Sequence, residues 1–311
     1  MSQLSKGTFT DADFTKTGAE IGLDPASSRK KTTYWRDVWR NFKKNKAAYV
    51  SLYVILLLIL LVIFGPMMNP FDYRTNDYTA INNAPNTVHW FGTDTMGRDI
   101  WTRVWEGGRV SLLIALLGTL IPEAIGMAIG GISGYFGGKV DTVIMRLIDI
   151  LMGIPSLIYM ILLMLIFGSG NIMTLVIAIS ITGWMGSARA TRGLILQLKG
   201  RDFVTASRTL GGSPSWIILR RLIPNTLGIR IVGITMSIPS VIFYEAFLSY
   251  IGLGVTPPMP SWGQLIKSAG EHFRSYPYQF IIPCARVGIT MLCFNLIGDG
   301  LRDALDPRLR T

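Results

Sequence analysis

The chain has 311 residues, of which 50% are hydrophobic and 16% are charged, and its formal net charge is +11. With a mean hydropathy of +0.40, this composition is typical of a polytopic membrane protein and excludes an ordinary soluble domain. In a soluble chain such a charge would suggest nucleic-acid binding. Here we expect no nucleic-acid partner, because the basic residues follow the positive-inside rule.

The N-terminal region divides into a polar tail and a basic segment. Residues 1–33 lack aromatic and β-branched runs, so we expect a disordered cytoplasmic tail without a cleavable signal peptide. Residues 34–46 alternate aromatic with basic side chains, which predicts an amphipathic helix lying on an anionic membrane surface. A calmodulin-type or nucleic-acid site is the weaker alternative so close to a membrane span.

Six segments are apolar enough to cross a membrane. The clearest is 47–66, whose stretch up to Phe64 holds thirteen Leu, Ile, Val or Phe residues and no charge, so that its insertion gains about 6 kcal/mol. Residues 67–108 are polar and predict a long extracytoplasmic loop. We expect the other five spans at 109–136, 147–167, 171–190, 228–251 and 278–298.

The distribution of basic residues sets the orientation. Six spans place both termini on one side, and with that side cytoplasmic, 23 of the 30 Lys and Arg residues lie inside and six lie in outside loops. The opposite orientation would reverse this bias, so we expect both termini to be cytoplasmic.

Three glycines in the second span recur every four residues, at Gly126, Gly130 and Gly134. This spacing places them on one helix face and lets another helix approach closely. The rival interpretation, a phosphate-binding glycine loop, fails because no GxxxxGK[ST] sequence is present.

The sequence predicts no catalytic residue, no metal site and no cofactor bound by this chain. His89 and His272 have no cysteine or histidine at ligand spacing, and there is no GxSxG or Cys/His pair. Cys284 and Cys293 fall on opposite faces of one helix, so we expect no intrachain disulfide.

A polar interruption, Asp202 to Pro224, separates two apolar blocks and predicts two short helices. Gly211 and Gly212 suit the end of the first, and Ser213 and Pro214 suit the N-cap and first position of the second. The first helix has the apolar spacing of a helix that rests in a groove on a partner protein. An ordinary amphipathic helix at the membrane surface is the alternative.

This interruption resembles the cytoplasmic loop signature of ABC importer permeases, which begins Glu-Ala-Ala and has a glycine three residues later. Ala206, Gly211 and Pro224 match it, while Thr205 stands in place of the glutamate and Ser207 in place of the second alanine. The resemblance implies that the loop couples the pore to an ATPase subunit. The residues assigned to this contact are Phe203, Thr205, Ala206, Ser207, Leu210, Gly211 and Pro224.

Four further stretches resemble the C-type permease subunit of dipeptide and oligopeptide ABC importers. They are HWFGTDTMGRDIWTR from His89, GYFGGKVDTVIMRLID from Gly134, EAFLSYIGLGVTPPMPSWG from Glu245 and NLIGDGLRDALDPR from Asn295. In the first of them, residues 92–99 predict a compact turn held by carboxylate–guanidinium bonds. The alternative for that turn is a docking site for a substrate-binding protein.

The resemblance implies an all-α protein with the fold of a type I ABC importer transmembrane domain, in the bacterial cytoplasmic membrane. Its permease core is 109–300, with a coupling loop at 191–227 and a cytoplasmic C-terminus at 301–311. The chain would form half of a pore for oligopeptides or dipeptides. The implied partners are a second, B-type permease, two subunits that bind ATP and Mg²⁺, an extracytoplasmic peptide-binding protein, and membrane lipid.

Other functions stay open at this point. Nickel-chelate and glutathione importers share these motifs. An ion-gradient-driven secondary transporter would need inverted repeats and a midplane ion site, and no convincing repeat is visible. A membrane receptor or scaffold explains the loop but not the chargeless spans.

Three charged residues lie well inside predicted spans: Glu123, Glu245 and Arg286. A charge facing lipid at mid-depth costs about 2.5–3.5 kcal/mol, so each should face a partner or a wet cavity. We therefore consider all three as candidates for the translocation path, with Arg286 contacting an acidic group of a peptide. The alternative, which we favour, is an intramembrane ion pair of Arg286 with Glu123 or Glu245.

Overall fold

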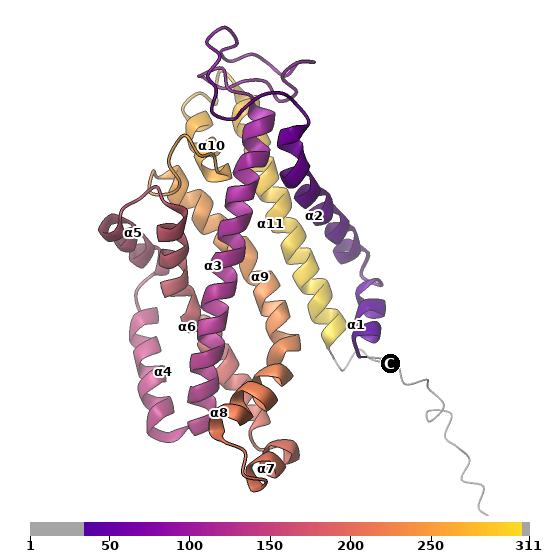
Figure 1. Ribbon diagram of the computed structural model, residues 1–311, viewed down its shortest axis with the longest axis vertical. Coiled ribbons are helices and arrows are strands. Elements are labelled where there is room, and N and C mark those ends of the chain that lie inside the picture. Colours follow the sequence, from indigo (N-terminus) through magenta and orange to yellow (C-terminus); the bar gives the residue numbers. More distant parts are fainter. Residues whose placement is uncertain (1–33, 307–311) are drawn as a thin grey trace, which may run out of the picture. The chain divides into compact units, whose positions relative to one another are not determined.

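The computed structural model describes residues 34–306, so the predictions for the tail at 1–33 and for 307–311 lie outside the described residues. The described part is helical, with isolated bridges as its only extended pairing. Figure 1 shows the elements, which are α1 (Tyr34–Phe42), α2 (Lys46–Phe64), η3 (Gly65–Met67), α3 (Ile100–Phe136), α4 (Gly138–Met152), α5 (Ser156–Phe167), α6 (Ile172–Leu198), α7 (Asp202–Thr209), α8 (Pro214–Ile217), η4 (Ile218–Leu222), α9 (Ile223–Tyr250), α10 (Trp262–Gly270) and α11 (Pro277–Leu305).

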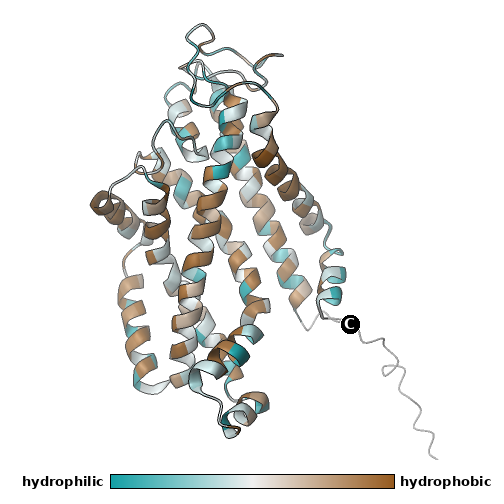
Figure 2. Cartoon of the chain, in the orientation of Figure 1, coloured by the Kyte–Doolittle hydropathy of each residue, from teal (hydrophilic) through white to brown (hydrophobic). Residues whose placement is uncertain are grey.

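In the described part, five helical segments are long and apolar enough to cross a membrane: Lys46–Met67, Ile100–Phe136, Ile172–Leu198, Pro214–Tyr250 and Pro277–Leu305. Figure 2 shows brown, hydrophobic residues along all of them. A sixth crossing exists only if α4 and α5 are counted as one span, and these two helices are bent by 83°. The span predicted at 147–167 is therefore not one straight helix but contains the end of α4, the bend and α5. The break falls just before Pro155, which lacks a backbone N–H and disfavours the helical conformation at the preceding residue.

The helix α3 begins earlier than predicted and so shortens the outer loop. The Asp99 side chain caps it by accepting a hydrogen bond from the Thr102 backbone N–H at 2.8 Å. With 37 residues, α3 is about 55 Å long, whereas the hydrocarbon core of a bilayer is about 30 Å thick. The helix α3 is therefore longer than the hydrocarbon core is thick, and its first turns are residues that the prediction placed in the loop 67–108.

The loop predicted as cytoplasmic is also shorter than the expected 191–227. The helix α6 continues to Leu198, and the next long helical segment already begins at Pro214. That segment contains the π-helical turn η4, which ends two residues before Pro224. Because proline cannot donate the usual hydrogen bond to the preceding turn, a local π-bulge lets the helix continue through it.

One helix was not predicted. The nine-residue α10 is capped by the Ser261 side chain and lies where the sequence suggested only a loop. Its first residue, Trp262, is fully buried, and the indole Nε1 donates a hydrogen bond to the Val104 carbonyl at 2.9 Å. A nine-residue helix depends on such tertiary contacts for its stability. Its sequence is also too short to show a clear helical periodicity.

The glycine stripe of α3 packs directly on α6, as its spacing predicts. A Cβ at Gly126 would lie 2.7 Å from the Trp184 carbonyl oxygen, and one at Gly130 would collide with the Ala188 carbonyl oxygen. A Cβ at Gly134 would lie 3.0 Å from the Arg192 carbonyl oxygen. The prediction of a close helix–helix contact is confirmed, and this contact holds together two of the helices that line the cavity described below.

The loop between η3 and α3 is tied together by the charged residues of the 92–99 turn. The Arg98 guanidinium Nε lies 2.8 Å from the Asp94 carboxylate, which confirms the predicted carboxylate–guanidinium bond. The Nδ1 atom of the His89 ring lies 2.9 Å from the Asp99 carboxylate. Gly92 and Gly97 have φ of +76° and +74°, a conformation that glycine adopts without steric cost.

The close contact between α3 and α6 generates the first testable prediction. Gly130→Ala should destabilise the folded protein by about 1–3 kcal/mol, because the added methyl group forces two backbones apart. Gly193→Ala on α6 is the matched control, since a Cβ there meets no atom within 4 Å. The measurement is the thermal unfolding midpoint of each variant in the same detergent. A Gly130→Ala protein as stable as Gly193→Ala would contradict this account of the helix contact.

Candidate functional site

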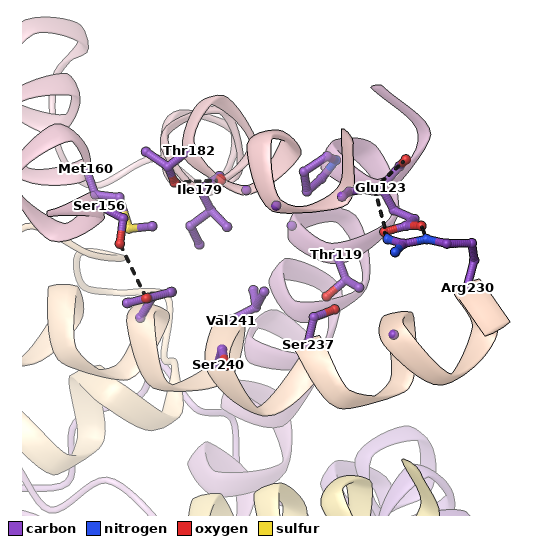
Figure 3. Close-up of a pocket in the computed structure, with 17 residues that line it drawn as sticks. Thr119, Glu123, Ser156, Met160, Ile179, Thr182, Arg230, Ser237, Ser240 and Val241 are labelled. Carbon is purple, nitrogen blue, oxygen red and sulfur yellow. Dashed lines mark hydrogen bonds and ion pairs between the residues drawn. The ribbon is translucent and has the colours of Figure 1, made fainter. Parts of the chain in front are cut away.

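A cavity of about 380 Å³ lies between α3, α5, α6 and α9. It is lined mainly by small and hydroxyl-bearing residues, as Figure 3 shows for part of the set. The lining residues are Gly118, Thr119, Pro122, Glu123, Ser156, Met160, Ile179, Thr182, Gly183, Gly186, Ser187, Arg230, Gly233, Ser237, Ser240, Val241 and Tyr244. All of these residues belong to helices, so the helical bundle itself encloses a cavity with polar residues between its apolar segments.

One face of α9 supplies much of this polar lining. Arg230, Ser237 and Tyr244 are spaced seven residues apart, with Gly233 and Ser240 between them. Residues at intervals of three and four share a helix face, so these side chains form one stripe. In Figure 3 Ser237 and Thr119 of α3 point toward one another. The Tyr244 hydroxyl lies 3.4 Å from that of Ser156.

A buried ion pair forms one part of the cavity wall. The guanidinium of Arg230 contacts the Glu123 carboxylate through two hydrogen bonds, of 2.6 Å from Nε and 2.5 Å from Nη2. Nη2 also donates to the Ser187 hydroxyl at 3.0 Å. Glu123 is 7% exposed and Arg230 is 8% exposed. The pair therefore joins α3 and α9, contacts α6, and leaves the cavity without net charge from these two groups.

Arg230 is the cavity residue that sequence reasoning missed. The prediction began the fifth span at residue 228, which places Arg230 at the edge of that span, and counted Arg230 among the cytoplasmic basic residues. The structure extends this helical segment to Pro214, so Arg230 lies well inside it. The seven-residue spacing to Ser237 and Tyr244 is the signal that would have identified the stripe.

Glu245, the second candidate, does not line this cavity. Its carboxylate is fully buried and accepts hydrogen bonds from the hydroxyls of Ser111 at 2.9 Å and Ser249 at 3.0 Å. Ser111 also accepts the Trp262 backbone N–H at 3.1 Å, which links α3, α9 and α10 around the carboxylate. This arrangement holds helices together and does not face the cavity.

Arg286, the third candidate, also lies away from the cavity. Its guanidinium carbon lies 4.8 Å from the ring centroid of Trp105 and 5.7 Å from that of Phe91. Glu123 is paired with Arg230 and Glu245 with hydroxyl groups, so the predicted ion pair of Arg286 with either glutamate is wrong. Of the three intramembrane candidates, only Glu123 lines the cavity.

The loop between α6 and α8 has the local structure that its sequence predicts. The helix α7 ends before Gly211, whose φ is +82°, and the Ser213 side chain caps α8, with Pro214 at its first position. Val204 and Ser207 are buried, and the Ser207 hydroxyl donates to the Phe203 carbonyl at 2.7 Å. The other assigned residues are exposed: Phe203, Thr205, Ala206, Leu210, Gly211 and Pro224.

The exposed tip of this loop is unusually apolar. Leu210 is 88% exposed, and Phe203 and Trp216 are 39% and 42% exposed. Arg208 lies over the Tyr135 ring, and Arg221 lies over Trp216. Large apolar side chains in such numbers on a polar loop are typical of a surface that another protein covers.

Two family models match the chain. Residues 126–311 match the binding-protein-dependent transport system inner membrane component, and residues 33–85 match the N-terminal TM domain of oligopeptide transport permease C. A solved structure, an inward-facing form of the MetNI methionine ABC transporter, aligns with a TM-score of 0.49 and 18% identity over 65% of this chain and 94% of that chain.

Curated relatives match over most or all of the chain. The oligopeptide transport system permease protein OppC of Bacillus subtilis is 43% identical over 310 residues, which cover 100% of both chains. The dipeptide transport system permease protein DppC of B. subtilis is 42% identical over 79% of this chain and 77% of its own length. OppC of Escherichia coli K12 is 42% identical over 79% of this chain and 82% of its own length.

These matches favour an importer permease over the ion-gradient-driven transporter and over the membrane receptor or scaffold. Proteins of this kind are non-catalytic, multi-pass membrane subunits with the fold of an ABC importer permease, and separate subunits hydrolyse the ATP. The chain therefore belongs to the family of binding-protein-dependent transport system inner membrane components.

Proposed function

We propose that this chain is the C-type permease of an ATP-driven importer and forms half of the pore through which oligopeptides or dipeptides enter the cell. The observation that carries this proposal is the full-length similarity to a protein named as an oligopeptide permease. The cavity between α3, α5, α6 and α9 is the part of this chain that we assign to the translocation path.

The chemistry of the cavity is compatible with peptides of varied sequence. Hydroxyl groups of Thr119, Ser237 and Ser240 offer hydrogen bonds to the peptide backbone, which is the same for every sequence. The two charges in the lining, Glu123 and Arg230, neutralise each other. The lining thus has no net charge that would select acidic or basic side chains, which leaves substrate choice to the peptide-binding protein.

The exposed tip of α7 is assigned to energy coupling. Phe203, Leu210 and Trp216 provide an apolar surface for a groove on an ATP-binding subunit, where ATP and Mg²⁺ are bound. Because Thr205 stands in place of the family's glutamate, we expect this contact to depend on shape and apolar area more than on an ion pair. Closure of the ATPase dimer would then move α7 and, through the attached helices, the cavity walls.

The remaining partners follow from the family. We expect a second, B-type permease to complete the pore and an extracytoplasmic peptide-binding protein to deliver the substrate above the outer loop. The charge distribution supports cytoplasmic termini and a cytoplasmic α7. Nickel-chelate and glutathione importers are the alternatives within the same class.

Two measurements test the proposal. The first is purification of the tagged chain from native membranes in mild detergent, with mass spectrometry of the proteins that accompany it; a second permease and ATP-binding subunits are expected. The second is uptake of a labelled oligopeptide by cells with and without this chain, in competition with glutathione and a nickel–histidine chelate. Uptake of the chelate or of glutathione, but not of the peptide, would assign the chain to one of the alternatives.

A substitution at the loop bend tests the coupling role. Gly211→Asp should insert normally into the membrane but lose transport, because it adds a charge to the apolar surface that the ATPase covers. Gly211→Asn is the matched control: it has the same size and tolerates the same positive φ, but it carries no charge. The measurements are membrane abundance, recovery of the ATPase and peptide uptake. Full uptake by Gly211→Asp would contradict the assignment of α7.

A second pair of substitutions tests the ion pair in the cavity. Arg230→Gln should destabilise the protein by about 3–5 kcal/mol, because it leaves the Glu123 carboxylate buried without a counter-charge. The double variant Glu123→Gln/Arg230→Gln removes both charges and should recover most of this loss. Thermal unfolding midpoints of the two variants and of the unmodified protein provide the comparison. Equal destabilisation of the single and the double variant would show that the pair is not the source of the effect.

A further inference from the structure

A second hollow, separate from the cavity, lies between α2, α3 and α11. This groove has a volume of about 380 Å³, and its walls are almost entirely apolar, with Ile55, Leu58, Leu112, Leu113, Leu116 and Phe294 among the lining residues. Its α3 residues precede those that line the cavity, so the groove lies nearer the outer end of α3. Figure 1 shows α11 passing between α2 and α3 in this region.

With the proposed cytoplasmic termini, the groove lies toward the outer end of the apolar run of α2. Val62 lines it, and the apolar run of α2 ends just beyond, at Phe64. At this end Arg109 is fully engaged: its guanidinium donates to the Val62 carbonyl at 2.9 Å, to the Ile63 carbonyl at 2.6 Å and to Glu106 at 2.8 Å. Arg109 therefore caps α2 and adds little free positive charge.

Arg286 lies one helical turn farther out, without a counter-ion. On α11, Arg286 precedes the groove residue Thr290 by four residues. On α3, the ring that Arg286 contacts, Trp105, precedes the groove residue Arg109 by four residues. Arg286 is half-buried over the rings of Trp105 and Phe91. Among residues 34–306, no carboxylate lies within ion-pair distance of this guanidinium, and its N–H groups have no hydrogen-bond acceptor. The two rings attract the positive charge but do not satisfy its five N–H donors.

We propose that the groove and Arg286 together bind one phospholipid of the outer leaflet. One acyl chain occupies the apolar groove, and the phosphodiester accepts hydrogen bonds from the Arg286 guanidinium. A lipid combines an apolar chain with an anion at the edge of the hydrocarbon layer, which is where the groove and the unpaired cation lie. The planar guanidinium suits two phosphate oxygens at once.

Charge complementarity favours a lipid whose phosphate is its only charge. In phosphatidylglycerol the phosphate charge is uncompensated, whereas phosphatidylcholine carries an ammonium group that reduces the net attraction to Arg286. The site should therefore bind phosphatidylglycerol more tightly. A helix of the second permease is the competing occupant, and it would need an acidic side chain at the depth of Arg286.

Native mass spectrometry of the purified, delipidated transporter complex tests the site. Titration with phosphatidylglycerol should produce one tightly held adduct, with phosphatidylcholine bound more weakly. Arg286→Gln should weaken phosphatidylglycerol binding about tenfold, as expected for the loss of a charge-assisted hydrogen bond. Leu113→Trp places bulk in the groove at a position that is already 45% exposed, and it should weaken both lipids to a similar degree.

The matched control is Arg74→Gln. It makes the same change of charge at an arginine of the outer loop that also lies over an aromatic ring, with 4.9 Å from its guanidinium carbon to the Tyr73 centroid. It should bind phosphatidylglycerol like the unmodified complex. If Arg286→Gln does not assemble, Leu113→Trp decides the question alone.

Three results would overturn the proposal. The first is unchanged phosphatidylglycerol affinity in Leu113→Trp, which would leave the groove without a role. The second is an equal loss of affinity in Arg74→Gln and Arg286→Gln, which would indicate attraction by overall charge. The third is the absence of any adduct, together with a crosslink from position 113 to the second permease, which would identify a protein helix as the occupant.

Discussion

A charge in the hydrocarbon layer must be compensated by another group, because water is not available there to solvate it. The chain meets this constraint in three ways. Glu123 and Arg230 compensate each other across two helices, while Glu245 is surrounded by hydroxyl groups. Arg286 lies only against aromatic rings. The first arrangement shapes the cavity, the second fastens α10 to the bundle, and the third is the basis of the lipid site that we propose.

Backbone N–H and C=O groups in the hydrocarbon layer also need partners within the protein. Helices satisfy their own N–H and C=O groups, so the chain crosses the membrane as helices and places irregular structure at the ends. Where the glycine stripe lets α3 and α6 approach closely, backbone packs against backbone with little side-chain volume between them. This contact fixes α3 and α6 against each other, and the polar face of α9 completes the cavity beside them.

The exposed loop between α6 and α8 is the basis for assigning the coupling contact. The loop between α6 and α8 has a well-defined structure, with a left-handed glycine and a capped second helix, yet it presents Leu210 almost fully to solvent. A protein gains stability by covering such a side chain, so its exposure in the single chain points to a partner subunit. The cavity and this loop lie on continuous helices, which gives a direct mechanical connection between them.

Much of this protein followed from local sequence. The apolar run of α2 identifies a span because transfer of each side chain depends on its own chemistry. Gly211, Ser213 and Pro214 identify the helix break because caps and bends depend on one or two residues. The repeat of Gly126, Gly130 and Gly134 identified a packing face without revealing its partner, α6.

The tertiary structure decided how distant residues meet. Arg230 was predicted at the cytoplasmic edge of its span, and Arg286 was given the wrong partner, because the pairing of charges depends on which helices are neighbours and how they are rotated. The bend between α4 and α5 and the short helix α10 likewise depend on contacts made elsewhere in the bundle. Hydropathy and capping are properties of a few adjacent residues, whereas a cavity and its ion pair are properties of four helices that only the folded chain brings together.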